Sequence, residues 1–264
     1  MLKSLPQLTR RNASWTPLQR RTWLATQRRR ERIKFADAPV LGLLDGLVAH
    51  FGFDESGGNR MDDVNGYALV PFNLDMGNAP GVIGNAVSFD GSGGYLAGTE
   101  ETTAFSPTSD GFAVSVWVNF SNTVDPEGDA YFLSVWHDTD WPAGSSWHIC
   151  STCPANGNIT VEMLGESMSG FSASVDLSGW AHVCLVFDAA AGQWSLYLNG
   201  VLGATTQYDY WPVSGQLGVG SHINPITDPP DLMMDELAIW SRGLSATEVA
   251  QLYNNGNGLP YELF

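Results

Sequence analysis

The segment Gly179–Thr206 most constrains the fold, because it reads as three short strands joined by two tight turns. In two of these strands, His182–Phe187 and Gln193–Leu198, side-chain character alternates with the period of two that is typical of a half-buried strand. The second strand ends at Asn199-Gly200, a dipeptide that tolerates the positive φ angles of a type I′ hairpin turn. Val201–Thr206 then returns along it. The apolar faces of such hairpins must be buried against a partner sheet, so the segment predicts a two-sheet antiparallel β-sandwich in an all-β chain.

The remainder of the chain supplies further strands and one short helix. Residues 46–54, 112–120 and 233–241 are β-rich and are separated by stretches rich in glycine, proline and aspartate. Three tryptophans on predicted strands, Trp117, Trp194 and Trp240, are expected to be packing residues and not ligand contacts. After residue 244, Ser245 and Glu248 have the spacing of a capping box, which predicts the start of a short C-terminal helix.

Charge divides the chain into two parts. Of its 12 lysines and arginines, ten lie within residues 1–34, and residues 1–40 contain only two acids, which leaves this segment at +8. Residues 41–264 hold the other 26 acids and two arginines, a net charge of −24. We therefore expect a basic N-terminal arm, residues 1–40, ahead of a sandwich domain, residues 41–264. The sequence Thr16-Pro17-Leu18-Gln19 has the form of a helix start, so the arm is expected to be partly helical.

Five separated motifs resemble those of one known family. They comprise the opening strand with Gly46, Leu47, Val48, Ala49, Phe51, Phe53 and Asp54; the set Ala86, Phe89, Asp90, Gly91 and Tyr95; the set Trp180, His182, Val183, Asp188, Asn199 and Gly200; the pair Asp235-Glu236 with Trp240, Arg242 and Leu244-Ser245; and the helix end Leu252-Tyr253-Asn254. Together they resemble LamG-like domains of the concanavalin A-like lectin/glucanase superfamily over about residues 44–258. The resemblance implies a jelly roll and leaves the function open, because function resides in sites and not in folds.

The same superfamily includes laminarinase-type glycosidases, which the chain does not match. The catalytic strand of those enzymes has the pattern Glu-x-Asp-x-x-Glu, in which alternation directs the acids to one face. Here Asp235 and Glu236 are adjacent and are flanked by Met233, Met234, Leu237 and Ala238, so we expect the two acids to point to opposite faces. The sequence therefore predicts a protein that is not an enzyme.

Calcium is the cofactor that the resemblance suggests. LamG-like and lectin-type domains often bind one ion through loop carboxylates and carbonyl oxygens, the ligands that a hard cation prefers. The preferred ligands here are Asp62, Asp63 and Asp235. Acidic loops also arise without a metal in a body with 26 acids, so this alternative stays open.

A soft-metal site is the second candidate. Cys150-x-x-Cys153, His148, His182 and Cys184 have the side-chain types that zinc prefers. The three cysteines can equally be small buried residues, or Cys184 can pair with one of the other two.

Aromatic residues in predicted loops form a candidate carbohydrate surface. Sugars bind to aromatic platforms beside polar groups, and the sequence offers Trp141, Tyr208, Tyr210 and Trp211 near Asp138 and Asp140. The same aromatic residues would also serve to cover sheet edges or to contact a neighbouring subunit.

The basic arm is expected to dock on a partner through arginines. Six of them lie in the predicted helix: Arg20, Arg21, Arg28, Arg29, Arg30 and Arg32. Clustered arginine binds nucleic acid phosphates, but it also pairs well with carboxylates in protein interfaces. We favour an acidic protein surface over nucleic acid.

These features predict a non-catalytic structural or adhesion module. A body of this kind with a docking arm suits a virion component, such as a phage capsid decoration or tail protein exposed on the virion surface. The alternative is a soluble or exported lectin-like protein that binds glycans outside the cell.

Overall fold

The computed structural model describes residues 42–72, 77–120, 129–136, 146–152, 157–164, 169–208, 214–220 and 231–264. These residues belong to the second of the two units into which the chain divides, Gly42–Phe264. The predicted basic arm and its six docking arginines lie outside the described residues. The domain boundary at residue 40 therefore stays a prediction.

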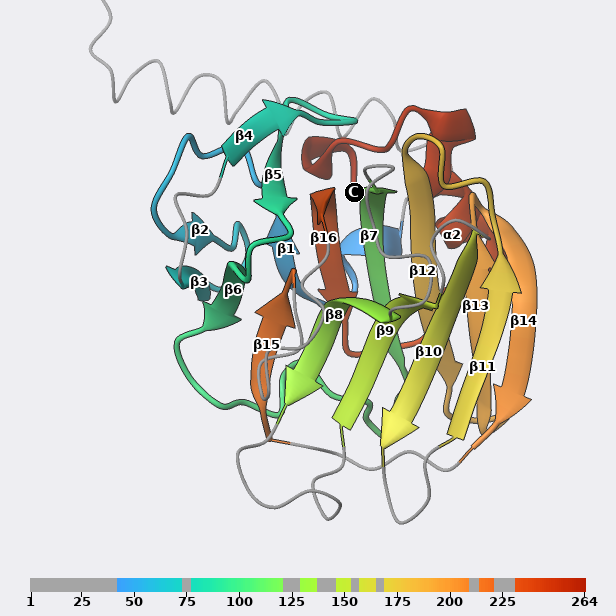
Figure 1. Cartoon of the computed structure of the whole chain (residues 1–264). Helices are drawn as coiled ribbons and strands as arrows, with labels where there is room; N and C mark the ends of the chain where they lie inside the picture. Colours follow the sequence, from blue (N-terminus) through green and yellow to red (C-terminus); the bar gives the residue numbers. More distant parts are fainter. Residues whose placement is uncertain are drawn as a thin grey trace, which may run out of the picture. The chain divides into compact units, whose positions relative to one another are not determined.

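Two antiparallel sheets form a sandwich, as the sequence predicts (Figure 1). Sheet A has the strand order β14-β13-β12-β7-β16-β5-β4, with β1 also paired to β16, and sheet B has the order β11-β10-β9-β8-β15-β6-β3-β2. The strands of sheet A are β1 (Leu47–Phe51), β4 (Gly77–Pro80), β5 (Asn85–Asp90), β7 (Phe112–Phe120), β12 (Ala181–Asp188), β13 (Gln193–Leu198), β14 (Val201–Gln207) and β16 (Asp231–Trp240). Those of sheet B are β2 (Arg60–Met61), β3 (Ala68–Phe72), β6 (Tyr95–Gly98), β8 (Asp129–Trp136), β9 (Ser146–Thr152), β10 (Asn158–Leu164), β11 (Ser169–Ser174) and β15 (Gln216–Val219).

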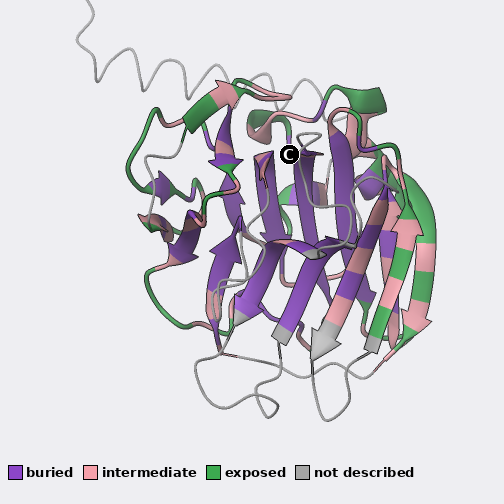
Figure 2. Cartoon of the chain, viewed as in Figure 1, coloured by how far each residue is buried: buried purple, intermediate pink, exposed green. Residues whose placement is uncertain are grey.

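The main core lies between the two sheets. Every second residue of β7, from Phe112 to Val118, is fully buried in it, and the strand forms the centre of sheet A (Figure 2). Opposite it, sheet B contributes alternate residues such as Trp147 and Ile149. Trp117, Trp194 and Trp240 are all buried, which confirms that they are packing residues.

A second, smaller core covers the outer face of sheet A. The helix α2 (Ala246–Tyr253) buries Val249 and Leu252 against outward-facing residues of β7, β12 and β16, and Trp240 donates from Nε1 to the Leu43 carbonyl at 2.6 Å. The chain then continues through a short 3-10 turn, η5 (Tyr261–Leu263), to Phe264, which belongs to the same cluster. Sheet A is thus packed on both faces, and its central strands read as continuous apolar runs.

The local signals for the turn and the helix are confirmed. Asn199 and Gly200, between β13 and β14, have φ angles of 51° and 75°, as a type I′ turn requires. Helix α2 begins with the expected capping box, in which Ser245 and Glu248 satisfy each other's backbone donors. Arg242 holds this end in place, because its guanidinium pairs with Glu248 at 2.6 Å and donates to the Asp45 carbonyl at 2.7 Å.

The opening strand is shorter than predicted. β1 ends at Phe51, and Phe53 has a φ angle of 56°, which breaks the extended backbone inside the predicted strand 46–54. The following loop contains the two-residue strand β2, which the sequence pattern did not indicate. No helix among the described residues is long and apolar enough to cross a membrane.

Candidate functional site

A bulge in β16 determines where its two acids lie. Along the pairing with β7, Asp235 lies opposite Trp117 and Ala238 opposite Ser115, so two residues of β16 face one of β7. Glu236, one of these two, has a φ angle of 50°. The left-handed region is unfavourable for a residue with a Cβ, and such strain persists only where surrounding contacts hold it.

The expectation that Asp235 and Glu236 point to opposite faces is wrong. Met234 and Leu237, on either side of the pair, both belong to the main core. The extra residue of the bulge shifts the alternation by one, and both acids lie on the outer side of sheet A. There Asp235 accepts bonds from the backbone N–H groups of Val82 and Ile83, and Glu236 contacts His50.

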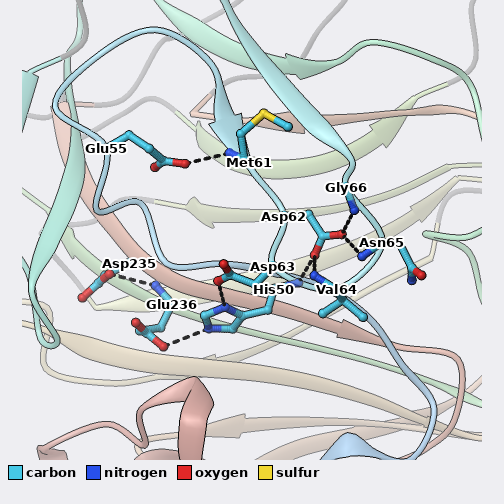
Figure 3. Close-up of polar contacts among 10 residues, drawn as sticks. All are labelled: His50, Glu55, Met61, Asp62, Asp63, Val64, Asn65, Gly66, Asp235 and Glu236. Carbon is cyan, nitrogen blue, oxygen red and sulfur yellow. Dashed lines mark hydrogen bonds and ion pairs between the residues drawn. The ribbon is translucent and has the colours of Figure 1, made fainter. Parts of the chain in front are cut away.

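His50, the fourth residue of β1, is the centre of the site (Figure 3). Its Nδ1 lies 3.0 Å from Asp63 Oδ2, and its Nε2 lies 3.0 Å from Glu236 Oε2. The side chain is only 2% exposed, and its ring stacks on Tyr261 at a centroid distance of 4.7 Å. Two carboxylates bonded to the two ring nitrogens favour the imidazolium form, in which both nitrogens donate.

The pKa values result from this arrangement. Burial acts to lower the pKa of His50, but the hydrogen bonds and charges of Asp63 and Glu236 outweigh it and raise the pKa to about 9. Burial raises the pKa of Asp235 to about 7, although three backbone N–H groups donate to its carboxylate. His50 is therefore a buried cation at neutral pH, held in an acidic corner of the molecule.

The other acids of this corner stabilise loops. Asp62 accepts from the backbone N–H groups of four residues, His50, Val64, Asn65 and Gly66, at 2.6 to 3.0 Å. Asp54 accepts from Asn85 N at 2.7 Å, and a Cβ on Gly84 would collide with its carboxylate. These bonds fasten the loop after β1, and the turn between β4 and β5, to sheet A.

The predicted calcium ligands therefore converge on one corner but already have protein partners. Asp62 and Asp235 accept backbone N–H groups, and Asp63, whose side chain is 51% exposed, pairs with His50. Within the described part of the chain, no group of three or more His, Cys, Asp or Glu side chains is arranged to hold a metal ion.

Sequence reasoning considered Glu236 together with Asp235 but missed His50 and its contact with Glu236. His50 is separated from Glu236 by 186 positions, so only the fold brings them together. The one available signal was the histidine itself, at an outward position of an otherwise apolar strand. Chemically, the arrangement is a buried ion pair that joins β1 to β16.

The predicted zinc ligands are not brought together. His182 and Cys184 lie on β12, where both flank residues of the main core and so point outward from sheet A, whereas His148 and Cys150 point outward from sheet B. The sandwich thickness separates the two pairs. Cys184 is a free, buried thiol whose pKa is raised by burial, so the proposed pairing with another cysteine is wrong in this structure. Cys153 lies outside the described residues.

One residue of the predicted carbohydrate surface is described. Tyr208 comes after β14, packs against the main core, and accepts a bond from Trp194 Nε1 at 3.2 Å through its carbonyl. Five others, Asp138, Asp140, Trp141, Tyr210 and Trp211, lie outside the described residues, so this surface stays a prediction.

Comparisons with known proteins agree with the fold. The chain is similar over 80–82% of its length to solved toxin binding domains: that of botulinum neurotoxin serotype D (TM-score 0.63, 17% identity), that of Paraclostridial Mosquitocidal Protein 1 (0.62, 16%), and that of botulinum neurotoxin DC in complex with rat synaptotagmin II (0.61, 14%). It spans only about half of those chains, 52–53%. No curated protein matches the sequence.

A family model identifies the body of the chain. Residues 90–250, well over half of the sequence, match the model described as the concanavalin A-like lectin/glucanases superfamily. The family resemblance seen in the sequence motifs is thereby confirmed, and the match includes the central hairpins and the Asp235-Glu236 strand. The chain belongs to the concanavalin A-like lectin/glucanase superfamily, and its body is a lectin-type sandwich of the LamG-like kind.

Proposed function

We propose that this protein is a non-catalytic binding and adhesion module, which its basic N-terminal arm attaches to a larger assembly. The hydrogen bonds that Asp235 and Glu236 of β16 already make are the main support for the proposal that the protein is not catalytic. Asp235 is bonded to three backbone N–H groups and Glu236 to His50. A glycosidase needs two carboxylates that flank the substrate bond, with room for it between them. These two are instead occupied in fastening the corner of sheet A.

The lectin-type fold supports a binding role. The solved domains that the chain resembles are named as binding domains of toxins, and one of them is in complex with rat synaptotagmin II. At 14–17% sequence identity, the similarity to these domains supports a shared fold but does not identify the ligand. We infer that the ligand is a carbohydrate, because the predicted aromatic and acidic loop residues suit sugar hydroxyls.

A glycan array probed with the full chain tests the binding role, and release of reducing ends from laminarin and agarose tests catalysis. We expect binding to a subset of glycans without release of reducing ends. Release of reducing ends in proportion to protein concentration would refute the non-catalytic assignment. An array without any bound glycan would refute the carbohydrate part of the proposal.

The arm supports placement in an assembly such as a virion, with the sandwich displayed at the surface. The arm, with a charge of +8, attracts the −24 body of another copy or the surface of an acidic partner protein. We expect the full chain to self-associate at low salt and to dissociate at high salt, as measured by light scattering after size exclusion. Replacing the six docking arginines by glutamine should abolish this association. A monomer at every salt concentration would favour the exported lectin as the alternative.

The proposal includes a calcium ion that is bound by the loop containing Asp63. Asp63 is exposed, and only its Oδ2 is bonded to His50, so that Oδ1 faces away from this bond. A ligand that binds the folded state raises the unfolding temperature by mass action. We expect calcium to raise this temperature relative to chelator in the native chain, and we expect Asp63→Asn to remove the shift. An identical temperature with calcium and with chelator would refute the calcium site.

A further inference from the structure

We propose that the C-terminal segment Ala246–Phe264 is an acid-released strap: when His182 is protonated, the segment lifts from the outer face of sheet A while the two sheets stay folded. The strap comprises α2, η4 (Asn254–Gly256) and η5 (Figure 1). The inference goes beyond the proposed function, since it concerns how the module responds to pH and not which ligand it binds.

Tyr253, the last residue of α2, covers His182. The His182 side chain points outward from sheet A, because its neighbour Val183 belongs to the main core, and it is 0% exposed. Tyr253 is only half-buried; its ring centroid lies 6.1 Å from that of His182 and 5.8 Å from that of Trp117, on which it stacks. A Cβ on Gly200, in the turn after β13, would come within 2.9 Å of the Tyr253 ring. The end of the helix is therefore seated on His182, Trp117 and that turn.

The His182 ring is bonded at one nitrogen and not at the other. Its Nε2 lies 2.8 Å from Ser115 Oγ, whereas its Nδ1 is buried without a hydrogen-bond partner among the described residues. A neutral ring can leave one nitrogen without a proton, but an imidazolium carries a proton on both. Protonation would thus place a second N–H and a full charge in this site, with no described group to accept the new bond. A buried charge of this kind is costly unless it is paired.

No ionised group among the described residues contacts the His182 ring. The groups packed around it are uncharged and come from β7, β12, the turn after β13 and α2: Ser115, Trp117, Cys184, Asn199 and Tyr253. On β16, Asp235 lies opposite Trp117, on the side away from His182, and on α2 Glu248 is paired with Arg242. The simplest way to hydrate a protonated His182 is therefore to move Tyr253.

The strap is fastened differently at its two ends. At its start, Glu248 pairs with Arg242 at 2.6 Å. At its far end, Tyr261 stacks on His50, which its two carboxylate partners already hold as a cation. Of the two histidines beneath the strap, His182 is thus the one whose charge changes in acid.

The size of the response follows from the titration of His182. Burial lowers the pKa of His182 from its ordinary 6.5 to about 3, so the stability that the neutral ring contributes is complete above pH 6.5 and is lost as the pH falls toward 3. The ring regains its ordinary pKa once the strap lifts and water reaches it. The lifted population therefore rises about tenfold for each pH unit in this range, or about a hundredfold between about pH 7.5 and about pH 4.5.

Thiol labelling of the full chain measures the strap through Cys184. This residue lies two positions after His182 on the outward face of β12, is 0% exposed and belongs to the smaller core. A dithiodipyridine reagent reacts with thiols in acid as well as at neutral pH, free cysteine corrects for its own pH dependence, and mass spectrometry of peptides locates the label. We expect Cys184 to be labelled about a hundredfold faster at about pH 4.5 than at about pH 7.5. The far-UV circular dichroism should be retained, and Cys150, which is buried on sheet B, should stay unlabelled.

Two variants and a control isolate His182. His182→Gln has no ionisable ring, so its Cys184 labelling should differ by less than about threefold between the two pH values. Tyr253→Ala leaves His182 uncovered, so Cys184 should be labelled rapidly at both pH values. His148→Gln changes a buried histidine of sheet B and should keep the full acid response.

The native chain and the variants together decide the proposal. Cys184 labelling that does not rise in acid, or that rises equally in His182→Gln, would overturn the strap. Labelling of Cys184 and Cys150 together, with loss of the far-UV signal, would also overturn it, because acid would then unfold the whole domain.

Discussion

Replacing Glu236 by glycine removes two opposing effects at once. The native residue has a φ angle of 50°, a conformation that costs a residue with a side chain about 1–2 kcal/mol and that glycine adopts freely. The same change deletes the bond between Glu236 Oε2 and His50 Nε2, which is 3.0 Å long and joins two charged groups. A hydrogen bond of this kind contributes about 1.5–3 kcal/mol. At neutral pH the lost bond outweighs the relieved strain, and we expect Glu236→Gly to destabilise the protein by about 1 kcal/mol.

The sign of this effect should depend on pH. The folded-state pKa of His50 is about 9, above its ordinary value of 6.5, so the stabilisation is fully present below pH 6.5 and is lost as the pH rises through 9. The shift corresponds to about 3 kcal/mol for the whole network, because one pKa unit is worth about 1.4 kcal/mol. Above that pH, Glu236 faces a neutral ring, with Asp54 and Asp63 as acidic neighbours. There the glycine variant should be as stable as the native chain or more stable.

Urea unfolding of both proteins at about pH 6, pH 8 and pH 10 measures this difference. The step from pH 8 to pH 10 is the diagnostic one, because burial together with the charge of Glu236 raises the pKa of Asp235 to about 7, and that group titrates mainly below pH 8. Asn255→Gly is the control, because Asn255 has a φ angle of 54° on the exposed surface without an ionic partner. Its effect should be small and independent of pH. A stability difference for Glu236→Gly that stays constant across the three pH values would refute the buried ion pair.

Three further predictions concern stability. Burial lowers the pKa of His182 to about 3, so the stability that the neutral ring contributes is fully present above pH 6.5 and is lost as the pH falls. His182→Gln should therefore lose less stability than the native chain between about pH 6 and pH 4, as measured by acid unfolding followed by circular dichroism. Asp62→Ala deletes an acceptor of four backbone N–H groups and should cost about 2–4 kcal/mol in urea unfolding, with Asp62→Asn costing less. Trp240→Ala empties the centre of the smaller core and should cost about 3–5 kcal/mol; a loss below about 1 kcal/mol would contradict that packing.

The sequence predicted well the features that local signals determine. The Asn199-Gly200 turn and the Ser245 capping box each depend on residues adjacent or three apart, and the structure confirms both. The alternation along β7 correctly predicted which of its side chains lie in the main core, because no bulge in β7 interrupts that alternation. The two-sheet architecture is a result of such strands, since each needs an apolar partner.

The candidate site could not be predicted in the same way. The bulge at Glu236 adds one residue to β16 and reverses the facing of the residues after it, and the sequence Asp235-Glu236-Leu237 contains no glycine to signal a left-handed residue. The partner of Glu236 is His50, at the other end of the domain sequence. When a contact with a residue far away in the sequence maintains a backbone conformation, neither hydrophobic periodicity nor residue propensity can predict it.

The double covering of sheet A has a consequence for how the molecule opens. Strands β7, β12 and β16 have the main core on one side and the smaller core on the other, while the described residues of sheet B pack against one core only. Amide protons of β7 and β12 should therefore exchange with deuterium only when the whole domain unfolds, whereas those of β14 and β11 should exchange through local opening.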